Sequence, residues 1–217
     1  MSPAPNPSTA HLSALDQLLA SFGDGLKAMS AAGGASRPRP VATGEALSEG
    51  ERREAASLMR VNHAGEVAAQ GLYHGQALMA RDPVVRQQLL AAAREEQDHL
   101  HWCAERLQEL GDGPSKLTPL WYASSAAIGA LAGLRSDATS LGFVAETERQ
   151  VSAHLGEHLE RLPAGDAGSR VVLQAMQSDE ERHGQEAVAA GGALPPAPVR
   201  GLMRLVSQVM KFGAARL

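Results

Sequence analysis

The sequence of 217 residues has little cysteine, few aromatic residues and few β-branched runs. Its single cysteine, Cys103, excludes an internal disulfide and fits a reducing compartment. Aromatic residues make up only 3% of the chain, and long β-branched runs are scarce, so neither an all-β nor an α/β domain is expected. No basic block is dense enough to track phosphates, and the formal charge of −4 argues against nucleic-acid binding.

The chain also lacks the segments that target a protein into or across a membrane. No uncharged apolar run reaches the roughly 20 residues that span a bilayer. The nearest approach is residues 117–134, a stretch rich in Ala, Gly and Ser. The first ten residues lack a basic region followed by an apolar one, so a secretory signal is not expected. We therefore expect a protein on the cytoplasmic side, either free or lying peripherally on the cell membrane.

Apolar residues at helical spacing cover most of the chain. An amphipathic helix at 11–29 and a Gly/Pro/Ser linker at 31–48 come first, so we divide the chain into residues 1–48 and a main domain at 49–217. Ser48 with Glu51 has capping-box spacing, and Asp82-Pro83 is typical of a helix start. The predicted helices of the main domain cover residues 51–80, 83–110, 119–134, 136–162, 169–190 and 199–216.

The lengths of the connections predict the order in which these helices pack. Short turns join 51–80 to 83–110 and 136–162 to 169–190, and short turns favour antiparallel neighbours. The long connection between these two hairpins, which holds the apolar helix 119–134, predicts a crossover. The expected fold is an all-α, ferritin-like four-helix bundle with an extra apolar crossover helix and flanking N- and C-terminal amphipathic helices.

Two Glu-x-x-His pairs stand inside apolar helical stripes, Glu96 with His99 and Glu180 with His183. A spacing of three puts both side chains of a pair on one helix face. An unpaired carboxylate in such a stripe would be costly to bury. One pair alone is usually a solvated surface pair, but two equivalent pairs favour a metal site.

A lone glutamate precedes each pair by about 30 residues. Glu66 is the only acid between Glu54 and Asp82, and Glu148 lies in the apolar stripe of its helix, with Glu146 beside that stripe. Two such hairpins can close around one centre, as in di-iron and di-manganese carboxylate bundles. We therefore predict six side chains as both metal ligands and catalytic residues: Glu66, Glu96, His99, Glu148, Glu180 and His183.

The chemistry of these residue types supports that prediction. Four carboxylates balance the charge of two divalent cations, so the cluster can be buried as a neutral unit. A ligating histidine needs a partner for its other ring nitrogen, and the candidates are Glu95, four residues before His99, and Asp179, four before His183. The other histidines of the bundle are expected to serve as hydrogen-bonded neighbours (His63, His154 and His158) or to lie at the surface (His74 and His101).

Five sequence motifs resemble those of the Coq7 family of demethoxyubiquinone hydroxylases. They are LMRVNHAGEVAAQGLYHGQ, REEQDHLHWC, TPLWYASSAAIGALAG, ETERQVSAHLGEHL and SDEERHGQEA, and together they span about residues 58–190. The six ligands of that family fall on the six residues chosen above, without a departure. Residues 1–45 are not covered by the resemblance, and no function is inferred for them.

The resemblance implies an O₂-dependent di-iron monooxygenase. Such an enzyme holds two irons (Fe) per chain and hydroxylates the ring of a demethoxyubiquinol intermediate in ubiquinone biosynthesis. No G-x-G-x-x-G follows a strand, so electrons are expected from an external reductant or from the quinol itself. A polyprenyl quinol lives in the bilayer, so the apolar crossover helix and the basic amphipathic C-terminal helix are candidate membrane contacts. A homo-oligomer is left open.

Two other classes of protein fit parts of the pattern. A ferritin-like iron-storage or peroxide-detoxifying protein would use the same bundle, but it would show a polar surface and no lipid-facing helix. A non-enzymatic lipid-binding helical protein would hold the Glu and His residues for structural reasons only. That second protein would purify without stoichiometric iron, so metal analysis separates it from the enzyme.

Overall fold

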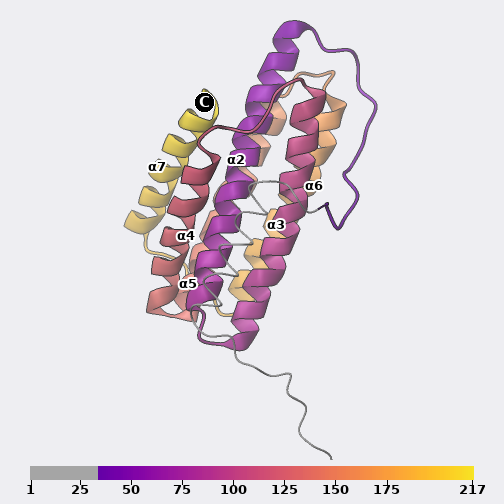
Figure 1. Cartoon of the computed structure of the whole chain (residues 1–217). Helices are drawn as coiled ribbons and strands as arrows, with labels where there is room; N and C mark the ends of the chain where they lie inside the picture. The colour runs from indigo at the N-terminus through magenta and orange to yellow at the C-terminus, as the bar shows by residue number, and fades with distance from the viewer. Residues whose placement is uncertain (1–33) are drawn as a thin grey trace, which may run out of the picture.

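Six α-helices and no strand make up residues 34–217, the part of the chain that the computed structural model describes (Figure 1). The prediction of an all-α, ferritin-like bundle is confirmed for these residues. The amphipathic helix predicted at 11–29 lies outside the described residues, and the division of the chain at residue 48 stays a prediction. The helices are α2 (Glu49–Met79), α3 (Pro83–Glu109), α4 (Thr118–Arg135), α5 (Asp137–Arg161), α6 (Ala167–Ala189) and α7 (Ala197–Ala214).

The helix starts follow the local chemistry of the sequence. Ser48 caps α2 in a capping box, because its side chain accepts from the Glu51 amide and the Glu51 carboxylate accepts from the Ser48 amide. Asp82 caps α3 by accepting from the Val84 amide, and Pro83 occupies the first turn. These caps satisfy amide groups that would otherwise lack partners at the helix ends.

Two apolar clusters form the core of the bundle at different levels, and both draw on α2, α3, α5 and α6. One cluster contains Met59, Leu107 and Leu155 among its members, and the other contains Leu89 and Val144. The predicted ligands lie in sequence between the residues of these two clusters on every one of the four helices. A layer of acids and imidazoles is therefore enclosed by apolar packing above and below it.

Helix α4 is the predicted crossover helix, and it packs closely along α2 (Figure 1). Glycines make this approach possible. A Cβ atom added at Gly71 would lie 2.4 Å from the Tyr122 carbonyl oxygen, and one added at Gly75 would lie 2.1 Å from the Ala126 carbonyl oxygen. Such distances leave no room for a side chain. This close packing fixes the helix that carries Glu66 and covers its outer face.

Helix α7 is amphipathic and lies beside α2 and α5. Its outward face leaves several large apolar side chains exposed, and α4 adds three more. In residues 34–217 we find no helix that is both long enough and apolar enough to cross a bilayer. The exposed apolar residues on the two helices are Leu120, Leu131, Leu134, Val199, Leu202, Leu205, Val206, Val209 and Phe212.

The expectation that His74 and His101 lie at the surface is wrong. Both are buried, at 8% and 7% exposure. Helix α4 covers His74, whose Nδ1 lies 3.0 Å from the Tyr122 hydroxyl. His101 lies close enough to His63 on α2 to help lower the pKa of that ring, although burial is the larger cause. Single-helix spacing could not show which outer faces another helix would cover.

Candidate metal centre

All six predicted ligands lie in the interior, and each of the four bundle helices contributes at least one. Helix α2 contributes Glu66, α3 contributes Glu96 and His99, α5 contributes Glu148, and α6 contributes Glu180 and His183. Their exposed fractions range from 0% to 4%. Side chains this polar are almost never fully buried without partners. Their shared position therefore needs a chemical explanation.

Four of the residues form a tight group around the Nδ1 atom of His99. Potential ligand atoms of Glu66, Glu96, His99 and Glu180 all lie within 4.8 Å of one another. The His99 Nδ1 atom is 3.5 Å from Glu66 Oε2, 3.1 Å from Glu96 Oε2 and 3.3 Å from Glu180 Oε1. Three carboxylates and one imidazole nitrogen thus face a common point, which is a ligand set that suits iron or manganese.

His183 contacts the other carboxylate oxygens of Glu96 and Glu180, which we call the shared glutamates. Its Nδ1 atom lies 3.1 Å from Glu96 Oε1 and 3.5 Å from Glu180 Oε2. Glu96 and Glu180 therefore stand between the two imidazoles, each with one oxygen toward each ring. Glu148 is 1% exposed, and its charge interactions with Glu180 and Glu96 place it at the same cluster. The arrangement has two halves, with a histidine and one further glutamate in each.

The buried polar atoms of this cluster fit a pair of cations. Glu66 Oε2, Glu96 Oε1, Glu180 Oε2 and His183 Nδ1 are buried and have no hydrogen-bond partner among residues 34–217. Native proteins rarely leave buried polar atoms without partners, and an ion is one of the usual reasons. Here the unpartnered atoms come from three helices and face one another. Cations between them would satisfy all four.

The protonation of the metal-free cluster is shifted by burial and by mutual charge. Burial is the main cause that raises the pKa of both Glu66 and Glu148 well above the ordinary value. Burial opposes the charged form of His183, but the nearby carboxylates of Glu180 and Glu96 outweigh it and raise the pKa to about 11. The pKa of His99 is likewise raised well above 6.5, against burial, by the charge of Glu96 and by several carboxylate contacts. When no metal is bound, protons on these residues therefore compensate the carboxylate charge that cations would otherwise balance.

The outer nitrogen of each histidine meets a carboxylate from the opposite helix. His99 Nε2 lies 3.0 Å from Asp179 Oδ2, and His183 Nε2 lies 3.4 Å from Glu95 Oε2. The sequence suggested each acid for the histidine four residues after it on the same helix. Instead the partners are exchanged between α3 and α6, because each ring reaches across the helix interface. Arg182 connects the two acids, at 2.5 Å from Glu95 Oε2 and 3.0 Å from Asp179 Oδ1.

The two candidate glutamates of α5 have different surroundings. Glu146 accepts hydrogen bonds from Arg149 and Gln150, each at 2.7 Å, and so is neutralised within its own helix. Glu148 Oε1 accepts from the Tyr73 hydroxyl at 2.5 Å inside the bundle. Glu148 is thus the residue of this pair that lies with the other acids.

Sequence reasoning assigned no role at the site to Tyr73. It follows Glu66 by seven residues, which is two helical turns, so the same face of α2 presents both side chains. That spacing was the available signal. Its hydroxyl is buried and donates a hydrogen bond to Glu148.

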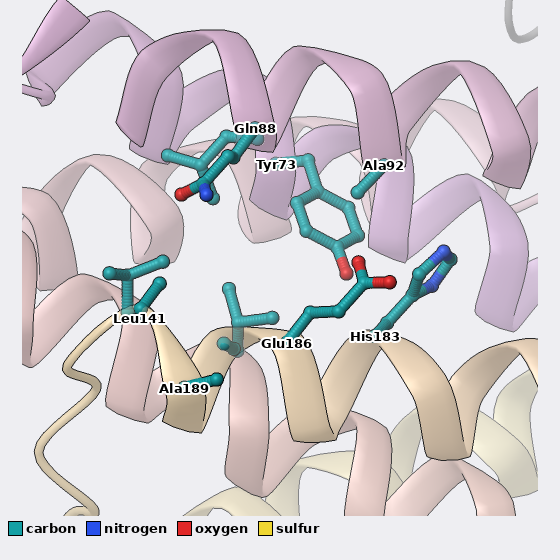
Figure 2. A pocket seen from close by; sticks show the side chains of 11 residues that line it. Tyr73, Gln88, Ala92, Leu141, His183, Glu186 and Ala189 are labelled. Carbon is teal, nitrogen blue, oxygen red and sulfur yellow. The ribbon is translucent and has the colours of Figure 1, made fainter. Parts of the chain in front are cut away.

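Two hollows flank the cluster. A cavity of about 380 Å³ lies between α3, α5 and α6, and Figure 2 shows Tyr73, His183 and Glu186 around it. A second hollow, of about 270 Å³, is an apolar groove bounded by α2, α4, α5 and α7. Its lining is almost wholly apolar and includes Ala69, Ile128, Phe143, Val151 and Met203. The cluster is therefore close to spaces that could admit small and apolar molecules.

Comparisons with known proteins agree with one another. A sequence model of the family described as "Ubiquinone biosynthesis protein COQ7" matches residues 53–214. A protein from Ralstonia pickettii (strain 12J) is 54% identical over 216 residues, covering 94% of this chain and 100% of its own length. Relatives from Cupriavidus necator and from Xanthomonas oryzae pv. oryzae are each 55% identical, and the alignments cover 94% and 98% of this chain. All three relatives carry the name 3-demethoxyubiquinol 3-hydroxylase.

Proposed function

The chain belongs to the COQ7 family of ubiquinone biosynthesis proteins, and on this premise we propose that it is a 3-demethoxyubiquinol 3-hydroxylase with two irons held by six side chains. The observation that carries the proposal is the buried group of Glu66, Glu96, His99 and Glu180, whose potential ligand atoms lie within 4.8 Å of one another. Buried ligand atoms without hydrogen-bond partners, His183 Nδ1 among them, support it. The proposed ligands are Glu66, Glu96, His99, Glu148, Glu180 and His183.

The chain's own residues have distinct tasks in this proposal. Glu96 and Glu180 would serve both halves of the site, since each has one oxygen near each histidine. His99 with Glu66 would complete one position, and His183 with Glu148 the other. Two bound irons would supply the chemistry of binding and activating O₂. The enclosing apolar clusters exclude water, which protects a reactive centre from side reactions.

Tyr73 has a positioning task beside the centre. Its hydroxyl donates to Glu148 Oε1, so the carboxylate is restrained when it is unprotonated. The same tyrosine lines the 380 Å³ cavity together with His183. A molecule entering this cavity would therefore meet the half of the centre that contains His183. The electrons for the reaction would come from an external reductant or from the quinol itself.

The polyprenyl tail of the substrate calls for an apolar surface, and α7 offers one. Val209 and Phe212 are 61% and 63% exposed. The helix and the residues just after it also carry basic side chains, at Arg200, Arg204, Lys211 and Arg216. Basic amphipathic helices are able to bind in the interface of a membrane. We therefore propose a peripheral location on the cytoplasmic side of the cell membrane. The apolar groove between α7 and α5 would receive the tail close to the helix that carries Glu148.

The iron-storage alternative has less support. It calls for a polar outer surface, whereas α4 and α7 expose nine large apolar side chains between them. The relatives compared above are named as hydroxylases. No observation of the described residues favours storage or peroxide removal over hydroxylation.

Reconstitution tests the proposed reaction directly. The protein is loaded anaerobically with Fe(II), its iron content is measured, and O₂ and a reduced demethoxyubiquinone analogue are added. Mass spectrometry should detect a product heavier by one oxygen atom. A preparation that holds two irons per chain and gives no such product would overturn the proposed activity.

Vesicle binding tests the proposed membrane contact separately. Co-sedimentation with anionic phospholipid vesicles should be lost in Val209→Glu, which places a charge on the exposed face of α7. Val84→Glu is the matched control, because Val84 is 60% exposed on α3, away from this face. Equal sedimentation of the two variants and the parent would count against α7 as the contact.

A further inference from the structure

Residues 34–47, which we call the strap, run along the outside of the bundle beside α3 and α6 before α2 begins (Figure 1). The sequence identifies most of this stretch only as a Gly/Pro/Ser linker. Ala35 and Leu47 nevertheless pack against the apolar core, and the Glu45 amide donates to the Gly165 carbonyl at 3.1 Å. The strap is therefore attached to the bundle at several points along its length.

The strongest attachment is at Asp98, the residue next to His99 in α3. Asp98 is only 1% exposed. Its carboxylate accepts from the Ser36 amide at 2.6 Å, from the Ser36 hydroxyl at 2.9 Å and from Arg37 Nε at 2.9 Å. A buried carboxylate without a counter-charge is costly, and here the strap supplies that charge. The interior of α3 next to the proposed ligand thus depends on a segment outside the bundle.

Arg37 also reaches the acid that holds His99. Its Nη1 atom is 2.8 Å from Asp179 Oδ2, the same oxygen that lies 3.0 Å from His99 Nε2. The guanidinium stacks over the ring of Trp102 at 5.0 Å from the centroid, and the Trp102 indole N–H donates to the Arg37 carbonyl. Two carboxylates and an aromatic face therefore hold the planar group in one orientation, which a lysine could not reproduce.

We propose that Arg37 is a positioning residue for the metal centre, acting on His99 through Asp179. The inference rests on the proposed metal centre. Asp179 orients the imidazole by accepting at Nε2, which leaves Nδ1 directed at the shared glutamates. The two histidines differ in this respect. Arg182 contacts both Asp179 and Glu95. Of these two acids Arg37 contacts Asp179, and its Nη2 atom also lies 3.4 Å from His99 Nε2. The strap therefore supports the His99 half of the centre and not the His183 half.

Anaerobic Co(II) titration tests this asymmetry without requiring turnover. Cobalt absorbs visible light according to its ligand geometry, so both affinity and the spectrum report on the site. Arg37→Ala should weaken one of the two metal equivalents by about tenfold, the lower end of the effect of outer-shell partners. Arg39→Ala is the matched control, because Arg39 lies on the same strap and, among residues 34–217, forms its ion pairs with Glu105 and Glu109 on α3. The control should bind both equivalents as the parent does.

Single-histidine backgrounds separate positioning from general loss of stability. In His183→Ala the remaining imidazole is His99, and adding Arg37→Ala should weaken metal binding there. In His99→Ala the same addition should have no effect on affinity. A merely structural role would weaken both backgrounds alike. Arg37→Lys, which keeps the charge without the planar fork, should fall between Arg37→Ala and the parent, and it answers the same question if Arg37→Ala is too unstable to purify.

The outcomes distinguish the inference from the proposal on which it rests. If the parent binds two Co(II) ions and both Arg37→Ala and Arg37→Lys bind them with parental affinity and spectrum, the positioning role is wrong. Equal weakening in both single-histidine backgrounds also overturns it. If the parent itself fails to bind two ions, the proposed metal centre is wrong.

Discussion

Metal binding should release protons, because in the metal-free protein the predicted ligands carry protons on the atoms that would bind the metals. The pKa of His183 is raised to about 11 by its contacts with Glu180 and Glu96, and the pKa of His99 is also raised well above 6.5. Both rings are therefore protonated at neutral pH, and each must lose the Nδ1 proton to accept a metal. Burial also raises the pKa values of Glu66 and Glu148, which favours the protonated form of each carboxyl when no metal is bound.

The size of the effect follows from this count. Each proton released raises the apparent binding constant about tenfold per pH unit, so the two histidines alone predict about a 100-fold rise per unit near neutrality in the overall constant for binding both metals. If Glu66 and Glu148 also release protons, the slope approaches about 10⁴-fold per unit. The sign is definite. Affinity increases with pH, since the metal competes with protons whose loss becomes easier.

Anaerobic calorimetry measures the number of protons directly. Mn(II) or Fe(II) is titrated into the metal-free protein at one pH in two buffers with different ionisation enthalpies. The difference between the observed heats gives the protons released, expected to be about two to four per two metals. His183→Ala should release about one proton fewer. A release near zero, or an affinity that stays constant between pH 6 and pH 8, would refute the protonation assigned to the cluster.

Three further predictions concern other parts of the molecule. Glu148→Ala should reduce turnover by more than about 100-fold and lose a metal equivalent on metal analysis. Glu146→Ala, which removes an acid paired with Arg149 within its own helix, should retain much of the activity, and the reverse order would contradict the choice between them. Gly75→Ala should cost about 1–3 kcal/mol in urea denaturation because its Cβ meets the backbone of α4, and Gly201→Ala, with open space around it, should be neutral or stabilising. Burial lowers the pKa of His158 to about 4. Below about pH 6.5 the unfolded chain therefore takes up a proton at this residue that the folded chain does not, so the free energy of unfolding should fall from pH 6.5 toward pH 4. His158→Gln should make the free energy of unfolding less dependent on pH in this range.

Much of the fold follows from short-range chemistry. The capping box at Ser48 and the Asp82-Pro83 start belong to residues close in sequence, so the first two helices of the bundle begin within two residues of the predicted positions. The six helices predicted in residues 49–217 all occur. Apolar periodicity indicates a helix and its buried face, because both depend on neighbours three and four residues away.

The sequence was less informative about which residues support the site. The pairing of Asp179 with His99 and of Glu95 with His183 crosses between α3 and α6. The hydrogen bond from Tyr73 to Glu148 joins residues 75 positions apart. Spacing within one helix cannot show such partners, because they depend on the relative rotation and height of two packed helices.

The amino-acid sequence by itself determined the helices and the six acids and imidazoles that we propose as ligands, because each stands out against the apolar stripe of its own helix. Tertiary structure alone decided which buried atoms share a point in space, which histidine each outer acid holds, and that residues 34–47 contact the support of His99. The physical reason is the distance along the sequence over which each kind of interaction acts. Propensity and periodicity act over a few residues, whereas the contacts of Arg37 with Asp98 and Asp179 form only once α3 and α6 have packed together.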